Sequence, residues 1–337
     1  MTIGHTIGDL AQTFLLRARN TQLQRQNQTL LQELSSGQAA DPVKHLRGDM
    51  GQLSNIDRDL TVLESHRQSA TEARFTATAM QSALERVQDI GEDLVNSAIS
   101  STTLKNDFHL SLLSDQASQS LEDIVSTMNA RPAGRAMFAG TQVDSPALVS
   151  APDIRALATS ELAGAATVND VFDALDVFFD SPGGTFETSV YLGNDTGLAP
   201  LQLSEGEAVQ LDIRADNPVS REILKYTAAL SLASDPSLGL NSDQRHEMAK
   251  QAGLRLMDAQ SAMTDLRAGL GYAEHRIDQA ATRVSSELAT LEQARNDLLS
   301  VDPFQTATDL ETTQSQIEML YTLTARSARL NLASFLS

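Results

Sequence analysis

The sequence contains no cysteine and no tryptophan, and aromatic residues make up only 4% of it. A chain without cysteine can form no disulfide bond and no thiolate metal site, and it has no cysteine nucleophile. Because few large side chains are available to fill a wide core, this composition favours narrow seams between helices. At 337 residues the chain is still long enough for two or three domains.

Basic residues are also scarce, because 25 lysines and arginines stand against 44 aspartates and glutamates and leave a formal net charge of −19. Nucleic-acid binding requires a basic face, so we predict no nucleic-acid partner. The same charge argues against anionic membrane surfaces. No run of about 18 apolar residues occurs, and the N-terminus lacks a basic stretch followed by an apolar one. We therefore expect neither membrane insertion nor a cleaved secretory signal.

Two long segments, residues 53–98 and 252–298, repeat an apolar residue every three or four positions. Their similar length and their many alanines predict two helices that pack side by side as a coiled-coil rod. Only Arg67 and Gly91 interrupt the first stripe. Arg67 has two interpretations, a buried paired charge that fixes the register or an edge residue whose charged end reaches water. Another helix is expected over 105–130, because Pro132 disfavours helical geometry in the residue before it.

The segment between the helical halves, residues 141–217, contains thirteen carboxylates and two arginines, so it is built to face water. Residues 167–180 predict an amphipathic helix that starts with a capping box at Thr167 and Asp170. Short strands are expected at Phe186–Leu192, Leu201–Leu203 and Ala208–Ala215. We therefore predict a small α/β, β-rich insertion domain in an otherwise mainly α chain. A further helix begins near Asn217 and Pro218.

Both ends of the chain predict helices of weak amphipathic character, over 5–36 and from Asp302–Pro303 onward. We expect them to order against other copies of the chain; the alternative is that they pair with each other in the monomer. The candidate assembly residues are the apolar ones of both ends: Ile7, Leu10, Phe14, Leu23, Leu30, Leu34, Leu310, Ile317, Leu320, Leu323, Leu330 and Phe335. The predicted organisation is an N-terminal assembly helix (1–44), two halves of the helical rod (45–140 and 218–300) around the insertion domain (141–217), and a C-terminal assembly helix (301–337).

The chain offers no catalytic or cofactor site. The glycines of "GRAMFAGT" (134–141) imitate a phosphate-binding loop, but their spacing is wrong, no lysine follows, and a helix rather than a strand precedes them. The six histidines are scattered without the pairing that zinc sites use, and no calcium-binding loop or nucleophile elbow occurs. We therefore expect no enzyme, no cofactor and no metal, and interpret 129–141 as a boundary turn.

Three stretches, in their order along the chain, resemble the flagellin superfamily, and its hook-associated members in particular. The first is "LLQELSSGQAADP" (30–42), near the end of the first terminal helix. The second is "NARPAGRAMFAGT" (129–141), which closes the N-terminal helical half in the family. The third is the C-terminal helix that follows "LEQARNDLLSVDP" (291–303). In the second stretch the positions that match the family pattern are Asn129, Gly134, Arg135, Phe138 and Gly140.

The resemblance implies a structural part of the bacterial flagellum that joins the hook to the filament. It implies export through the flagellar type III apparatus, an export chaperone in the cytoplasm, and self-association in a ring between a neighbouring hook-associated protein and flagellin. The resemblance also implies that the protein is secreted and located in the flagellum, at the hook–filament junction. Two alternatives stay open: a flagellin, the filament subunit itself, and a coiled-coil adaptor or signalling protein retained in the cytoplasm.

Overall fold

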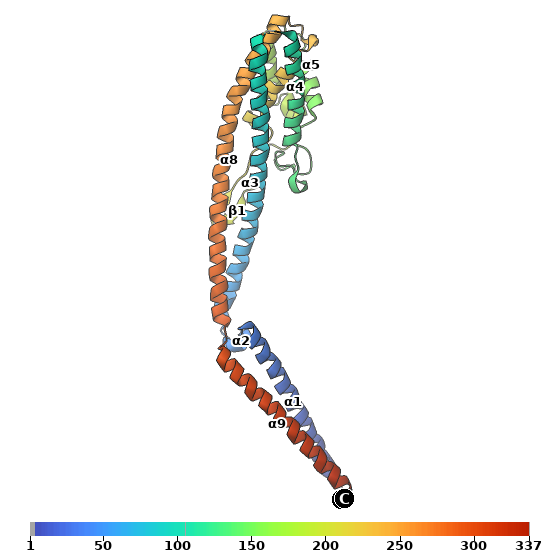
Figure 1. Cartoon of the computed structure of the whole chain (residues 1–337), viewed down its shortest axis with the longest axis vertical. Coiled ribbons are helices and arrows are strands. Elements are labelled where there is room, and N and C mark those ends of the chain that lie inside the picture. The colour runs from blue at the N-terminus through green and yellow to red at the C-terminus, as the bar shows by residue number, and fades with distance from the viewer. Residues whose placement is uncertain (1–3, 105, 337) are drawn as a thin grey trace. The chain divides into compact units, whose positions relative to one another are not determined.

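The computed structural model describes the backbone of residues 4–104 and 106–336, and the side chains of residues 11, 14–101 and 106–326. The chain is mainly helical with one small two-stranded sheet (Figure 1), as predicted. The elements are α1 (Gly4–Ser36), α2 (Pro42–His45), α3 (Gly51–Leu104), α4 (Asp107–Met128), η1 (Pro132–Gly134), α5 (Ala151–Glu161), α6 (Val168–Asp180), η2 (Phe186–Val190), β1 (Leu201–Ser204), β2 (Glu207–Val209), α7 (Pro218–Ser231), η3 (Pro236–Leu238), α8 (Ser242–Leu299) and α9 (Pro303–Leu336).

The chain forms two compact units, one made of Met1–Glu64 with Ser286–Ser337 and the other of Ser65–Ser285. Of the predicted limits, the one at residue 44 falls within α2 and the one at residue 301 falls between α8 and α9. The compact units instead divide within the continuous helices α3 and α8. None of the helices, over the residues described, combines the length and apolar character needed to cross a membrane.

In the second unit, α3 and α8 pack side by side and form the rod predicted from the periodicity. Every stripe position of α3 from Ala70 to Ala98 is buried, and so are most stripe positions of α8 from Ala252 to Val284. Arg67 is exposed, in agreement with the edge interpretation. Three contacts fix the antiparallel direction: Ala98 lies beside Gly253, Gln88 donates to Thr264 at 3.2 Å, and Arg74 pairs with Asp278 at 2.7 Å.

Small residues set the distance between these two helices. A Cβ at Gly253 would lie 2.9 Å from the Cβ of Ala98, which is closer than side-chain carbons normally approach. Gly91 leaves a notch in α3 that is filled by the side chain of Gln260 from α8. The amide of Gln260 is buried there without a hydrogen-bond partner among the described residues. The close approach therefore depends on the glycines as well as on the alanines.

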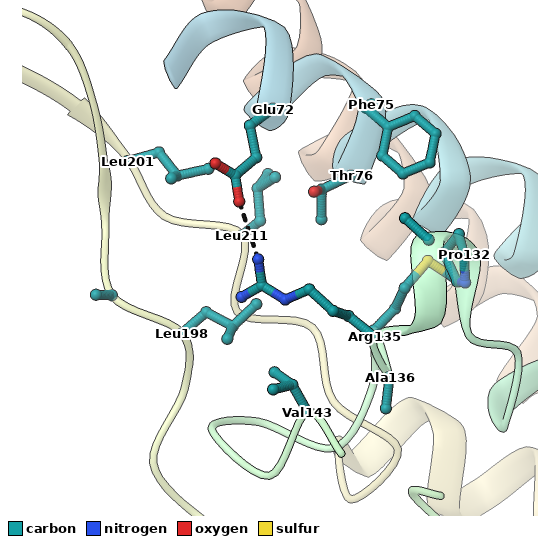
Figure 2. Close-up of a pocket in the computed structure, with 13 residues that line it drawn as sticks. Glu72, Phe75, Thr76, Pro132, Arg135, Ala136, Val143, Leu198, Leu201 and Leu211 are labelled. Carbon is teal, nitrogen blue, oxygen red and sulfur yellow. Dashed lines mark hydrogen bonds and ion pairs between the residues drawn. The ribbon is translucent and has the colours of Figure 1, made fainter. Parts of the chain in front are cut away.

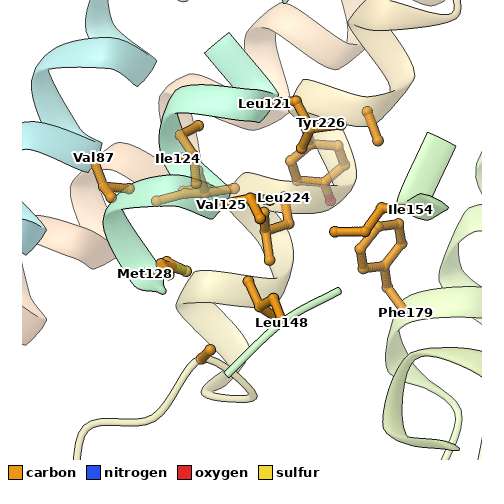
Figure 3. Close-up of a cluster of buried hydrophobic side chains, with 14 of the residues drawn as sticks. Val87, Leu121, Ile124, Val125, Met128, Leu148, Ile154, Phe179, Leu224 and Tyr226 are labelled. Atoms are coloured by element: carbon orange, nitrogen blue, oxygen red, sulfur yellow. The ribbon is translucent and has the colours of Figure 1, made fainter. Parts of the chain in front are cut away.

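The predicted insertion shares one hydrophobic core with the helices around it. Figure 3 shows residues of α4, such as Ile124 and Met128, and Leu224 of α7 in one cluster with Leu148, Ile154 and Phe179 of the insertion. The ring of Phe179 packs edge-to-face against Phe178 and at a tilt against Phe186, with centroids 4.7 and 5.4 Å apart. Five of the ten phenylalanines are buried in this core.

A buried lysine connects the insertion helix α6 to α7. The Nζ of Lys225 donates to Asp176 at 2.7 Å and to Asp180, and its side chain is only 3% exposed. Burial alone would lower the pKa of Lys225, but the hydrogen bonds to the two carboxylates raise that pKa above its ordinary value. The helix itself begins at the predicted capping box of Thr167 and Asp170.

The strand predictions for the insertion were only partly right. Leu201–Leu203 lies in β1, which pairs with β2 in an antiparallel hairpin. Phe186–Leu192 was predicted as a strand but begins as the helical turn η2, because Phe186 and Val190, four residues apart, are both buried on one side. Ala208–Ala215 leaves the sheet after Val209, because the amide of Ala215 donates to Phe138 instead. Helix α5 was not predicted.

Replacement of Gly253 by alanine should force α3 and α8 apart and destabilise the protein by about 1–3 kcal/mol. Gly269 is a matched control in the same helix, because a Cβ there meets no atom within 4 Å. Gly269→Ala should stabilise the helix by about 0.5–1 kcal/mol. Thermal unfolding followed by circular dichroism measures both changes. Equal effects of the two substitutions would contradict the close approach described here.

Candidate assembly surface and boundary turn

The boundary turn begins where Asn129 ends α4. The side-chain amide of Asn129 donates from Nδ2 to the carbonyl of Leu148 at 2.9 Å, and its Oδ1 accepts from the amide of Leu148 at 2.8 Å. Leu148 also forms an antiparallel β-bridge with Tyr191. The side chain of Asn129 thus makes the two backbone hydrogen bonds that a second neighbouring strand would make with Leu148. The matched position Asn129 therefore fixes the start of the insertion to the end of the first helical half.

Phe138 and Gly140 anchor the second part of this turn. The ring of Phe138 is 1% exposed, and its carbonyl accepts from Ala215 at 2.9 Å. Gly140 has φ +61°, and a Cβ there would overlap the carbonyl oxygen of Asn194 and lie 2.6 Å from that of Thr196. The turn therefore joins the two ends of the insertion, and only glycine fits its tightest point.

The hydroxyl of Tyr191 holds the same junction by donating to the carbonyl of Asn194 at 3.0 Å. Burial, and after it the negative charge of Asp216, raise the pKa of Tyr191 above its ordinary range. The phenol therefore stays a neutral donor across the physiological pH range.

Gly134 and Arg135 have a different place, on the surface of the turn. Gly134 has φ +80° and no atom within 4 Å of a Cβ, so its role is conformational. Arg135 pairs with Glu72 of α3 at 3.1 Å, at the rim of an apolar cavity of about 370 Å³ (Figure 2). Phe75 and Leu211 are among the residues that line this cavity. Its one ion pair is half exposed, and the cavity has no arrangement suited to acid–base or nucleophilic chemistry.

The candidate assembly residues lie in the first unit, where α1 and α9 run antiparallel beside each other (Figure 1). Backbone hydrogen bonds join the residues that follow α1 to the junction between α8 and α9, from Ala39 to Leu299 at 2.9 Å and from Val301 to Gly37 at 3.1 Å. Helix α9 starts at the predicted cap, since Asp302 accepts from the amides of Phe304 and Gln305. This pairing within one chain is the alternative that the sequence left open.

The structure separates the candidate assembly residues into three groups. Leu23, Leu30 and Leu310 are buried and Ile317 and Leu320 half-buried, whereas Phe14, Leu34 and Leu323 are exposed, to 73%, 39% and 56%. The side chains of Ile7, Leu10, Leu330 and Phe335 lie outside the described residues. The buried group closes the helix pair, and the exposed group leaves apolar surface for a further partner.

The seam of this helix pair also contains polar residues that the search for apolar patterns missed. Asn20 and Asn27 alternate at heptad spacing with Leu23 and Leu30, and the Oδ1 of each asparagine is buried with no partner among the described residues. In α9, Thr306 and Thr313 are buried on either side of Leu310. Asparagine inside a coiled-coil seam fixes the register at a cost in stability. The regular spacing was the signal that could have revealed these positions.

Over the residues described, no three histidine, aspartate or glutamate side chains gather as a metal site. Comparison with known proteins gives a specific match. The family model of the bacterial flagellin C-terminal helical region matches residues 255–336, which cover most of α8 and α9. The C-terminal region of the chain is flagellin-like.

Solved structures show a further likeness, in the fold of the chain. A protein of Vibrio parahaemolyticus assigned as a flagellar hook-associated protein superposes with a TM-score of 0.51 at 13% identity, over 73% of this chain and 95% of that one. FlgL of Bacillus cereus superposes with a TM-score of 0.52 at 12% identity, over 71% and 98%. The sequence has no significant match among the curated proteins. The C-terminal resemblance seen in the sequence is confirmed, while the two N-terminal stretches lie outside the matched region.

Substitution of Gly140 by alanine should destabilise the second unit by about 3 kcal/mol or more. The new Cβ would clash with two backbone carbonyl oxygens, which can move away only if the backbone of the insertion shifts. Gly134→Ala is the matched control. Its φ is equally unfavourable but the space is open, so the cost should be only about 1 kcal/mol. Chemical unfolding curves compare the two. An equal loss of stability in the Gly134 and Gly140 variants would show that the positive φ, and not the close approach of the backbone oxygens, causes the destabilisation.

Substitution of Asn27 by leucine should stabilise the α1/α9 pair by about 1–2 kcal/mol, because it removes an unpaired buried oxygen from an apolar seam. Gln28→Leu, on the exposed side of the same helix, should change stability by less than about 0.5 kcal/mol. Hydrogen exchange of the α1 amides measures both. Unchanged protection in the Asn27 variant would place this side chain outside the seam.

Proposed function

We propose that this chain is a structural component of the bacterial flagellum, a hook-associated protein that joins the hook to the filament. One observation carries the proposal. A flagellin-like C-terminal region is combined with a fold that covers 95% and 98% of two flagellar proteins of solved structure, one of them assigned as hook-associated. The matched fold covers 73% and 71% of this chain.

Assembly would use the terminal helices. Their pair buries little more than a narrow seam, and large apolar side chains such as Phe14, Phe304 and Met319 face outward, at 73%, 82% and 61% exposure. Burial of such surface is the main driving force for association, at about 25 cal/mol per Å². We propose that several copies form a ring through these helices, and that hook-associated and filament proteins flank it. Such a role is structural and not enzymatic.

Export would precede assembly. We propose that the chain leaves through the flagellar type III apparatus and that a cytoplasmic chaperone covers the apolar stripe of α9 beforehand. The absence of cysteine supports this route, since a chain unfolded for export then has no disulfide to break. The acidic segment 141–217 would face the surrounding water.

Flagellin itself is the second candidate, because the family region that matches is named for flagellin. The two functions differ in the product of self-assembly. A filament subunit polymerises without limit, whereas a junction protein stops at a short ring. Electron microscopy of the purified chain at high concentration separates them, since long filaments would favour flagellin.

Deletion of the gene tests the proposal in the cell. We expect intact hooks that carry no filament, with flagellin released into the medium, and motility restored by a plasmid copy. Filaments of normal length on the deleted strain would contradict a junction role. Loss of the filament subunit itself from cells and medium would instead point to flagellin.

A further inference from the structure

The two terminal helices differ in the sign of their charge. From Leu10 to Gln32 the sequence has three arginines and no acidic residue, whereas from Asp302 to Ala325 it has four acidic residues and no basic one. The charges are Arg17, Arg19 and Arg25 in the first stretch, and Asp302, Asp309, Glu311 and Glu318 in the second. Over their described side chains α1 is net basic, with three arginines against Glu33, and α9 is net acidic, with three carboxylates against Arg326.

These opposite charges are not used to hold the two helices of one chain together. The three arginine side chains are exposed, and so are Asp309, Glu311 and Glu318. Among the described side chains none of the three arginines lies within ion-pair distance of an acidic group; Arg19 instead donates to Gln22 at 3.2 Å. Contact within the pair is made by the uncharged seam of Leu23, Leu30 and Leu310.

Apolar side chains accompany the charges on the outer faces. Phe14 and Leu15 lie near the arginines of α1 and are 73% and 67% exposed, and Met319 follows Glu318 in α9 at 61% exposure. An apolar patch beside charge of one sign is a common composition for a protein interface, in which the charges select the partner and the apolar residues supply affinity. Each helix thus combines exposed apolar side chains with charges opposite in sign to those of the other helix.

We propose that α1 of one copy docks against α9 of a second copy, through the three arginines of the first and the acidic residues Asp309, Glu311 and Glu318 of the second. This inference rests on the proposed self-association and names its contact surface. Because the two surfaces differ, the contact is head-to-tail, and repetition of it leads to a ring or a helix and not to a closed pair.

Two charge-reversed variants test the contact. In the first, Arg17→Glu, Arg19→Glu and Arg25→Glu make both terminal helices acidic; in the second, Asp309→Lys, Glu311→Lys and Glu318→Lys make both basic. Each variant alone should self-associate about tenfold more weakly than the wild type at low salt, where charge interactions are least screened. A matched control with Arg58→Glu, Arg86→Glu and Lys250→Glu, exposed charges outside α1 and α9, should associate like the wild type.

Mixing of the two variants is the deciding measurement, with sedimentation velocity as the readout. A contact between copies is restored in the mixture, because the basic α1 of one variant meets the acidic α9 of the other. Charges that act within one chain stay mismatched in the mixture, so continued dissociation there would overturn the inference. If the wild type does not self-associate at high concentration, the proposed function fails as well; association of the wild type without rescue by mixing rejects only the contact named here.

Discussion

Much of the second unit depends on the close approach of two helices. Alanine and glycine along α3 and α8 bring the backbones near enough for many weak dispersion contacts, since each pair of atoms contributes only about 0.1–0.2 kcal/mol. A seam of this kind needs no large side chains, which explains how a chain with so few aromatic residues forms helices of 54 and 58 residues that stay paired. Five of the ten phenylalanines lie instead in the wider core around α6 and α7.

The boundary turn solves a different problem, the insertion of a segment into a helical frame. The side chain of Asn129 hydrogen-bonds to the backbone of Leu148 as a neighbouring strand would. Gly140 lets two backbone segments approach where any side chain would separate them. Both ends of the insertion are thereby tied to one point. An insertion held in this way can vary in sequence over its exposed surface while the helical frame keeps its geometry.

Periodicity sufficed to predict the long helices, because a stripe such as Leu84, Val87 and Leu94 has no other use than burial against a neighbour. The helix caps at Thr167 and Asp302 could also be predicted, because each depends only on residues within three positions of it. The insertion was harder, since Phe186 and Ala215 take their conformation from distant partners and not from their neighbours in sequence. At the terminal helices the apolar residues were found, but Asn20 and Asn27 were not, because polar residues in a seam look like surface residues until their spacing is counted.

The side chain of Gln260 in the notch of Gly91 has a consequence for how the helix pair responds to force. Buried amide atoms without hydrogen-bond partners lower stability, so this contact fixes the register through its shape and not through its energy. Displacement of α8 by one turn along α3 would bring Gln260 against Val87 or Leu94, whose side chains fill the space that glycine leaves open. The pair therefore resists sliding along its axis.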